Sequence, residues 1–314
     1  MKHILSTAKL REEMVQYLEK NFEEYEYRFV KAREVSDEDR EWADIFVTYG
    51  SDMEPGHMDA FKNLKWVMVM SAGLDDMPLE QMKGIHITNA KGIHKIQMAE
   101  YTIGLLLDYY KDIYQLKVDQ GKSHWRKQAT TEEIYGKSVH ILGTGSIGSH
   151  LAGVLKAFGT NTAGYNTEGR EVENFDQTHP VSDIHSHINE ADIVINILPS
   201  TEDTRGLLTE ETFKKMKDSS VFVNIGRGDI MTDETVSAVL SGRYIRHMML
   251  DVFNREPLPE DHEFYSYDNL TITPHASSKT PEYLTRAFDI FIYNLNRVND
   301  FDSMKNIINH ERGY

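Results

Sequence analysis

The feature that most constrains the fold is a glycine-rich turn between an apolar run and an amphipathic run. Residues 139–159 read VHILGTGSIGSHLAGVLKAFG, so that Gly143, Gly145 and Gly148 follow the apolar residues VHIL. The spacing G-x-G-x-x-G predicts a strand, a tight turn and a helix, because glycines permit the turn and the close packing of helix on strand. A strand–turn–helix unit of this kind predicts an α/β domain built on a parallel sheet.

The same turn predicts a dinucleotide site, because the amides at a helix N-terminus bind phosphate groups. A glycine-rich turn without a ligand is the alternative. Another strand ends about 20 residues later, as the fingerprint requires, and favours the dinucleotide site. The residues expected to contact the cofactor in this turn are Gly143, Thr144, Gly145, Ser146, Ile147 and Gly148.

Short apolar runs alternate with helical stretches along the whole chain and form two series, one before residue 97 and one after residue 137. Each series predicts a doubly wound parallel sheet. A single long helix is predicted over residues 96–120, and a C-terminal helix is predicted after Pro281. At 314 residues, the chain is also long enough for two domains.

Composition excludes several classes of function. The formal charge of −16 argues against nucleic-acid binding, which needs a cationic surface. The absence of cysteine excludes disulfides and cysteine-ligated metals and agrees with a reducing compartment, and no metal site is expected. No signal peptide and no membrane-spanning run is recognisable. A cytoplasmic protein without membrane or nucleic-acid partners is therefore expected.

Three later runs carry charged residues where strands are expected to end: Arg227 in NIGRGD, Glu256 in DVFNREPLP and His275 in TPHASS. A histidine can protonate the alkoxide that hydride transfer to a ketone creates, and a carboxylate can stabilise its imidazolium form. An arginine can bind the carboxylate of a 2-keto acid through two parallel hydrogen bonds from its planar guanidinium. Singly, the three residues read as a surface cation, a loop charge and a capping histidine. Their joint placement at successive strand ends favours a catalytic site.

Six runs of the sequence carry a family resemblance: SAGLDDMPL, ITNAKGIHKIQMAEYTIGLLL, ILGTGSIG, VFVNIGRGDI, LDVFNREPLP and ITPHASS. Through these runs, from about Leu64 onward, the chain resembles the D-isomer-specific 2-hydroxyacid dehydrogenase family. The resemblance implies that Arg227 binds substrate, that His275 is the acid/base and that Glu256 is its carboxylate partner. It places Asp251 near the nicotinamide carboxamide. The loop implied to hold the substrate carboxylate is Ser71, Ala72 and Gly73, and the further residues implied at the cofactor are Pro199, Thr204, Ile225 and His275.

The resemblance also implies a domain arrangement. A Rossmann-type cofactor domain, residues 98–282, is expected to be inserted into a flavodoxin-like substrate domain, residues 1–97 and 283–314. Relatives form dimers through the long helix and the loop after it, so a homodimer is expected. Trp125 would reach the neighbouring active site, or serve only as an interface anchor or a packing residue.

The expected reaction is the NAD(P)H-dependent reduction of a small 2-keto acid to the D-2-hydroxy acid. Candidate substrates resemble glyoxylate or hydroxypyruvate, or carry a bulkier side chain in a pocket around Tyr49, Gly50, Met53 and Trp125. Formate dehydrogenases differ by a glutamine at the position of Glu256, and phosphite dehydrogenases by a lysine in the SAGLD loop. A short phosphoglycerate dehydrogenase and a dinucleotide-sensing scaffold that resembles the corepressors of this family stay open as alternatives.

The choice between NADP and NAD depends on the stretch GYNTEGR. NAD-preferring relatives carry an aspartate at the position of Asn166, where it binds the ribose and repels a 2′-phosphate. Asn166 removes that repulsion, and Thr167 and Arg170 could bind the phosphate. Glu168 could instead act as the acidic ribose partner. NADP is the preferred prediction, with NAD as the alternative.

Overall fold

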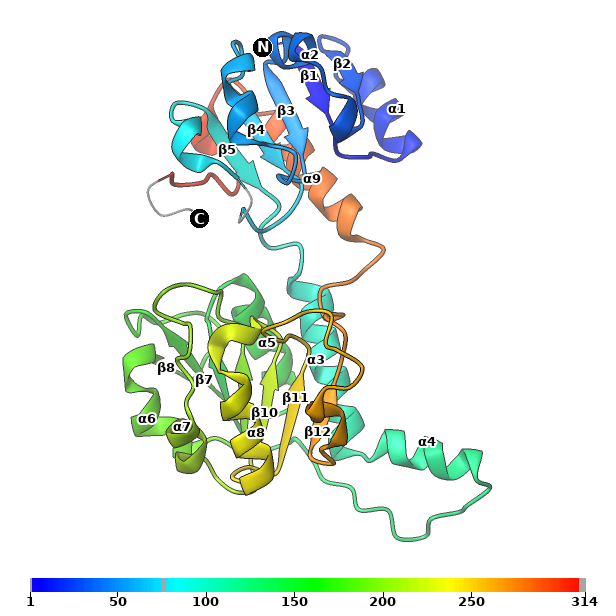
Figure 1. The fold of residues 1–314 in the computed structure, drawn as a ribbon, viewed down its shortest axis with the longest axis vertical. Coiled ribbons are helices and arrows are strands. Elements are labelled where there is room, and N and C mark those ends of the chain that lie inside the picture. Colours follow the sequence, from blue (N-terminus) through cyan, green and yellow to red (C-terminus); the bar gives the residue numbers. More distant parts are fainter. Residues whose placement is uncertain (1, 75–76, 311–314) are drawn as a thin grey trace. The chain divides into compact units, whose positions relative to one another are not determined.

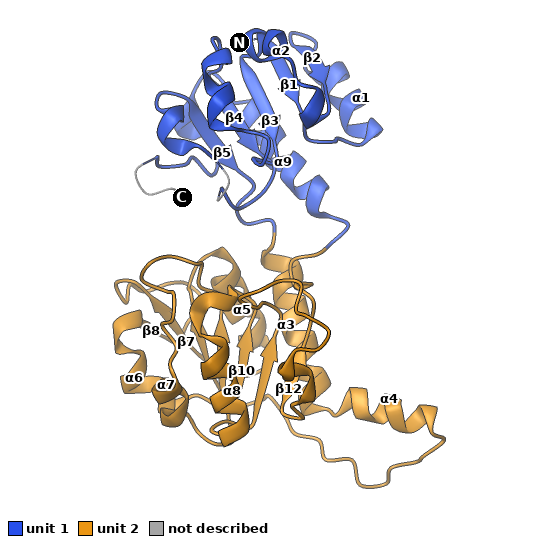
Figure 2. Ribbon diagram, viewed as in Figure 1, with its two compact units in different colours: residues 1–93, 280–314 blue, residues 94–279 orange. Residues whose placement is uncertain are grey.

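The computed structural model describes residues 2–74 and 77–310. The chain forms two compact units (Figure 2): unit 1 is Met1–Ile93 with Thr280–Tyr314, and unit 2 is His94–Lys279. These divisions lie a few residues before the domain boundaries expected from the sequence, at 97/98 and 282/283. The first division falls earlier because helix α3 begins at Lys95 and packs on α5 of unit 2.

Unit 1 is an α/β layer structure whose elements are shown in Figure 1. Its strands are β1 (His3–Ser6), β2 (Glu26–Phe29), β3 (Ile45–Thr48), β4 (Trp66–Val69) and β5 (His86–Asn89). Its α-helices are α1 (Glu12–Asn21), α2 (Asp37–Trp42) and α9 (Tyr283–Leu295), and its 3-10 helices are Ala32–Glu34, Pro55–Ala60, Leu79–Met82 and Phe301–Ser303.

Within the described residues, the five strands of unit 1 are parallel and follow the order β2-β1-β3-β4-β5, which confirms the expected flavodoxin-like arrangement. Successive side chains of a strand point to opposite faces, and both faces of this sheet are covered. Trp66 and Met68 belong to the apolar cluster that includes α1 and α9. Val67 and Val69 belong to the cluster on the other face. Near-continuous apolar strands are typical of such a doubly covered sheet.

Unit 2 repeats this architecture on a larger scale. Its strands are β6 (Ser138–Leu142), β7 (Asn161–Asn166), β8 (Gln177–Pro180), β9 (Ile193–Asn196), β10 (Val221–Asn224), β11 (His247–Leu250) and β12 (Leu270–Ile272). Its α-helices are α3 (Lys95–Tyr110), α4 (Ile113–Gly121), α5 (Ser146–Ala157), α6 (Ile184–His187), α7 (Glu210–Lys215) and α8 (Asp233–Gly242). Its 3-10 helices are Val181–Asp183, Ile188–Glu190, Gly228–Ile230 and Glu263–Ser266.

The strands described in unit 2 are all parallel and follow the order β12-β11-β10-β9-β6-β7-β8. This is the Rossmann order extended by one strand, with β6 and β9 at the point where the order reverses, and it confirms the expected fold class. Val221 and Val223 face the α3–α5 side, whereas Phe222 faces the side covered by α7 and α8. The carboxyl ends of all these strands therefore meet at one edge of a rigid, two-sided core.

The prediction of one helix over residues 96–120 is wrong. The chain leaves helical geometry at Asp112, which has φ 56° and ψ 30° and separates α3 from α4. Arg126, from the loop after α4, pairs with Asp112 at 3.2 Å and with Asp119 at 2.7 Å. This loop therefore folds back along α4, which extends outward from the body of unit 2 (Figure 1).

Candidate active site

The glycine turn connects β6 to α5 at the carboxyl edge of the unit 2 sheet. Gly145 is the N-cap of α5, and no side chain caps this helix. A Cβ on Gly148 would collide with the carbonyl oxygen of Gly143, so only glycine permits this approach of helix and turn. The exposed, uncapped first turn at Ser146 offers amides to an anion. The turn therefore fits the pyrophosphate of a dinucleotide.

Asn166, the last residue of β7, organises the turn that follows it. Its Oδ1 accepts hydrogen bonds from the amides of Glu168 at 3.2 Å and Arg170 at 3.0 Å. Its Nδ2 donates to the carbonyl of Arg170 at 2.9 Å and to the hydroxyl of Thr144 at 3.2 Å. The side chain thus ties the 166–170 turn to the glycine turn and leaves Thr167, Glu168 and Arg170 exposed.

Arg227 lies after β10 on a loop held by buried amides. The Asn224 side chain donates to the Arg227 carbonyl at 3.0 Å, and Asn196 donates to the Asn224 side chain at 2.9 Å. The exposed Arg227 guanidinium donates to the carbonyl of Gly226 at 3.0 Å. The backbone of the loop is therefore fixed, while the guanidinium lies at the surface.

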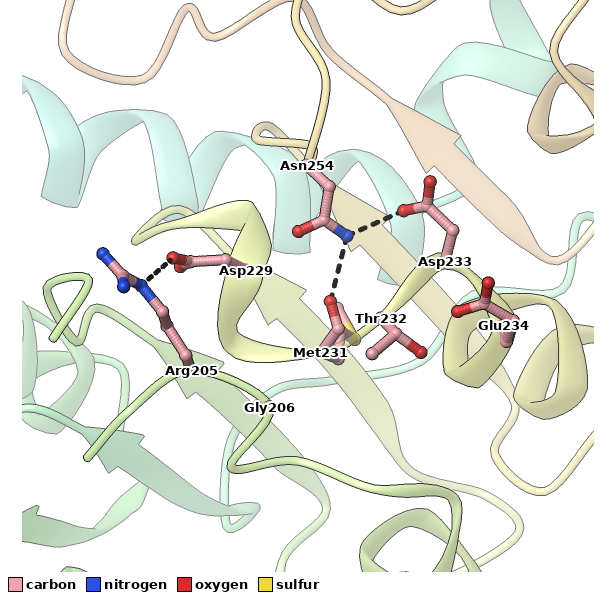
Figure 3. A pocket seen from close by; sticks show the side chains of 8 residues that line it. All are labelled: Arg205, Gly206, Asp229, Met231, Thr232, Asp233, Glu234 and Asn254. Atoms are coloured by element: carbon pink, nitrogen blue, oxygen red, sulfur yellow. Dashed lines mark hydrogen bonds and ion pairs between the residues drawn. The ribbon is translucent and has the colours of Figure 1, made fainter. Parts of the chain in front are cut away.

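The loop of Arg227 packs directly against the loop that leads to Glu256. A Cβ on Gly228 would collide with the backbone of Phe253, so this contact requires glycine. Asn254 donates to the Met231 carbonyl at 3.1 Å and to Asp233 at 2.8 Å (Figure 3). These residues clamp two loops that carry candidate catalytic side chains.

A surface cavity of about 480 Å³ lies beside this clamp. Arg205, from the loop after β9, reaches Asp229 at 3.3 Å across it (Figure 3). The residues that line the cavity are Arg205, Gly206, Asp229, Met231, Thr232, Asp233, Glu234 and Asn254. None of the three catalytic candidates belongs to this lining.

His275 and Glu256 are in direct contact. His275 Nδ1 lies 2.7 Å from Glu256 Oε2, and the other carboxylate oxygen accepts the amide of Phe253 at 3.0 Å. The His275 side chain is 45% exposed, and its Nε2 makes no hydrogen bond to any residue that the structure describes. A carboxylate at Nδ1 fixes the orientation of the ring and leaves Nε2 for proton transfer to a ligand.

The remaining cofactor candidates occupy the same edge of the sheet. Thr204 donates to the carbonyl of Pro199 at 2.6 Å and forms one turn with it. Ile225 is buried after β10. Asp251, directly after β11, is 1% exposed, with its carboxylate inside the protein. Because β6, β7 and β9 to β12 are parallel, the glycine turn, Asn166 and the catalytic candidates all lie at this edge.

Unit 1 holds the candidate substrate loop after β4. The hydroxyl of Ser71 donates to the carbonyls of Tyr49 and Gly73 at 3.2 and 2.9 Å. Asn89 donates to the Ala72 carbonyl at 2.7 Å. The amides of Ala72 and Gly73 make no hydrogen bond to another described residue, and such amides can bind a carboxylate.

A cavity of about 310 Å³ adjoins this loop and is lined by Tyr49, Gly50, Ser51, Ser71, Gly73, Leu74 and Met77. Of the residues expected around the substrate side chain, Tyr49 and Gly50 line it. Met53 does not, because its side chain is 2% exposed and packs in the core. Burial raises the pKa of Tyr49 and keeps its hydroxyl neutral. Trp125 lies in unit 2 and is 87% exposed.

Residues 2–74 and 77–310 contain no cluster of three side chains arranged to hold a metal ion. Among the helices in these two ranges, none combines the length and the hydropathy of a membrane span. Sequence reasoning missed Gly228, Asn254 and the turn-forming role of Asn166. The sequence shows the asparagines and the glycine, but only the folded backbone shows which groups they contact.

Comparison with known proteins agrees with this geometry. The family model described as D-isomer specific 2-hydroxyacid dehydrogenase, NAD binding domain, matches residues 103–277. A glyoxylate reductase of Thermofilum pendens is 32% identical over 246 residues, covering 76% of this chain and 73% of that protein. A D-3-phosphoglycerate dehydrogenase of Methanocaldococcus jannaschii is 29% identical over 313 residues, covering 98% of this chain and 60% of that protein.

Among solved structures, a D-isomer specific 2-hydroxyacid dehydrogenase family protein from Aeromonas salmonicida has a TM-score of 0.86 and 26% identity. The match covers 98% of this chain and 99% of that one. The family model spans more than half of the chain, and the fold and the glycine turn agree with it. The chain is therefore an oxidoreductase that belongs to the D-isomer-specific 2-hydroxyacid dehydrogenase family.

Proposed function

We propose that the protein reduces a small 2-keto acid to the D-2-hydroxy acid, with a proton from His275. The observation that carries the proposal is the 2.7 Å contact of His275 with Glu256 at the sheet edge that also holds the glycine turn. A nicotinamide dinucleotide, when bound at the glycine turn, would supply the hydride. His275 donates its proton from Nε2 to the forming alkoxide while Glu256 holds the ring at Nδ1. Reversal of the same steps oxidises the hydroxy acid.

Carboxylate recognition is assigned to Arg227 and to the Ser71–Gly73 loop. An arginine fork binds both oxygens of a carboxylate and polarises the neighbouring carbonyl, which favours attack by hydride. The amides of Ala72 and Gly73 add donors that carry no charge of their own. A lysine at position 227 would not reproduce the fork.

The substrate class is a 2-keto acid with a small or apolar side chain, of the glyoxylate or hydroxypyruvate type or bulkier. The cavity beside Ser71 supports this choice, because Leu74 and Met77 contribute apolar surface and the described lining contains no lysine or arginine. A phosphorylated substrate such as that of a phosphoglycerate dehydrogenase needs cations at its phosphate. The phosphoglycerate dehydrogenase alternative therefore has less support.

We propose NADP(H) as the preferred cofactor. Asn166 carries no charge, and its side chain holds the turn from which the exposed Thr167 and Arg170 can reach a 2′-phosphate. In Asn166→Asp, a carboxylate oxygen would replace the Nδ2 donor and face the Arg170 carbonyl. The negative charge would repel the 2′-phosphate, and loss of the hydrogen bond would weaken the turn that presents Thr167 and Arg170. Glu168→Gln is the matched control, since it removes the rival acidic ribose partner.

The decisive experiment measures loss of NADH and NADPH absorbance with glyoxylate, hydroxypyruvate, pyruvate, phenylpyruvate, branched 2-keto acids and phosphohydroxypyruvate. His275→Ala is expected to lower kcat by about 100-fold or more while it still binds the cofactor. The exposed His124 provides the control variant His124→Ala, which should retain wild-type kcat. Near-normal turnover by His275→Ala would refute the assigned mechanism. Cofactor binding without turnover of any acid would favour the dinucleotide-sensing scaffold.

The same panel tests the cofactor proposal. The ratio of kcat/KM for NADPH over NADH should exceed one in the wild type and in Glu168→Gln, and should fall in Asn166→Asp. A wild-type preference for NADH would refute the phosphate-binding role of Thr167 and Arg170. Preference for NADH that disappears only in Glu168→Gln would assign the ribose contact to Glu168.

We also propose a homodimer formed through α4. Ile113, Tyr114, Leu116 and Trp125 on this helix and its following loop are 48%, 69%, 37% and 87% exposed. Apolar side chains grouped at a surface are typical of a protein interface. Tyr114→Glu should convert a dimer to monomer in sedimentation experiments, whereas Tyr265→Glu, at a residue 54% exposed elsewhere on unit 2, should not. A wild-type monomer would refute the assembly.

A further inference from the structure

Asp251 is a buried carboxylate whose hydrogen bonds all go to one short segment. Its Oδ1 accepts the Thr273 hydroxyl at 2.6 Å and the amide of Ala276 at 2.9 Å. Its Oδ2 accepts the amide of Ser277 at 2.9 Å. The side chain is part of a residue only 1% exposed, so these bonds are shielded from water. Charged acceptors form the stronger protein hydrogen bonds.

The segment that Asp251 binds, residues 273–277, carries His275 at its centre. The His275 amide donates to the Asp251 carbonyl at 2.8 Å and to the Thr273 carbonyl at 3.1 Å. His275 has φ 48°, a left-handed conformation that is unfavourable for a residue with a side chain. Such a conformation persists when the surrounding structure holds it on several sides. The Asp251 carboxylate accepts hydrogen bonds from residues on both sides of His275, and the Asp251 carbonyl accepts one from the His275 amide.

We propose that Asp251, with Thr273 as its hydroxyl partner, is a positioning residue that fixes the left-handed loop presenting His275 to Glu256. This inference rests on the proposed role of His275 as proton donor. It differs from the role that the family resemblance implies for Asp251, a contact with the cofactor. The carboxylate acts through the loop backbone and so governs where the imidazole lies.

Thr273→Val tests the proposal without changing charge, because valine has nearly the shape of threonine but no hydroxyl. The expected result is a fall in kcat of roughly tenfold, the size expected for one charge-assisted hydrogen bond. KM for the keto acid and Kd for NADPH should stay within about twofold of wild type. Thr273→Ser keeps the hydroxyl and should restore kcat. Thr271→Val is the control on the adjoining strand, where the hydroxyl bonds His247 instead at 2.8 Å.

A readout independent of turnover is amide hydrogen exchange in the peptide that contains Ala276 and Ser277. Exchange there should accelerate in Asp251→Asn, because one acceptor oxygen becomes a donor, and to a lesser extent in Thr273→Val. Unchanged exchange in both variants would overturn the proposal. So would a large rise in Kd for NADPH in Asp251→Asn with normal kcat in Thr273→Val, since that pattern belongs to a cofactor contact. If the wild type turns over no acid, exchange still decides whether Asp251 holds this loop.

Discussion

Replacement of His140 by glutamine tests how strongly burial of one imidazole makes the stability of unit 2 depend on pH. His140 lies in the middle of β6, is 2% exposed and contacts the hydroxyl of Tyr165 at 3.0 Å. Burial, followed by the nearby His179 and His187, lowers its pKa from 6.5 to about 4. The folded chain therefore keeps this ring neutral under conditions in which the unfolded chain protonates it.

The sign and size follow from this difference in pKa. Between about pH 6.5 and pH 4 the unfolded chain binds the proton and the folded chain does not, so the free energy of unfolding falls as the pH is lowered. One pKa unit corresponds to about 1.4 kcal/mol, so at pH 5 His140 should cost the folded state about 2 kcal/mol relative to pH 7.5. Above about pH 7.5 the contribution is nearly constant.

The assay is urea unfolding followed by far-UV circular dichroism at pH 7.5 and pH 5. His140→Gln should lower the free energy of unfolding at pH 7.5 through imperfect packing, but its loss between the two pH values should be about 2 kcal/mol smaller than in wild type. Tyr165→Phe is the matched control, because it removes the hydroxyl and leaves the buried imidazole, so the wild-type pH dependence should persist. An identical pH dependence in wild type and His140→Gln would refute the reasoning.

Two further predictions, with one control variant, concern the contact between the loops of Arg227 and Glu256. Gly228→Ala should cost about 1–3 kcal/mol of stability and lower kcat, because the added Cβ meets the Phe253 backbone. A thermal melt measures the stability. A melting temperature and a kcat equal to those of wild type would contradict the close contact. Asn254→Ala should cost about 1–3 kcal/mol by leaving the Met231 carbonyl without its donor, and it is checked by urea unfolding. Arg205→Ala, on the exposed side of the same cavity, should change stability by less than about 1 kcal/mol.

Much of the fold could be predicted because burial leaves a pattern in the sequence. Strands such as Ile193–Asn196 and Val221–Asn224 are covered on both faces and read as unbroken apolar runs. The strand Gln177–Pro180 was missed because it is at the edge of the sheet and is mostly polar. The break at Asp112 was missed because the apolar spacing continues through it, and only the backbone conformation and the Arg126 contacts separate the helices.

The candidate site was predictable at the level of strand ends. Parallel strands bring their carboxyl ends to one edge, so residues after β10, β11 and β12 could be grouped before any contact was known. The 2.7 Å contact of His275 with Glu256 lies at that edge. What could not be predicted is the use of Asn166 and Asp251. The sequence predicts both as cofactor-contacting residues, and the structure adds that each also bonds a loop backbone.

These anchors share a physical reason for being where they are. A loop that leaves a parallel sheet has backbone groups without strand partners, and short amide or carboxylate side chains can satisfy them. Asn166, Asn224, Asn254 and Asp251 do so in three loops of unit 2, those after β7, β10 and β12. The expected consequence is two classes of variant: changes at these anchors should lower stability and kcat together, whereas changes at the exposed His275 should lower kcat alone. A scan that measured both quantities and found no such division would show that loop geometry and chemistry are independent at this edge.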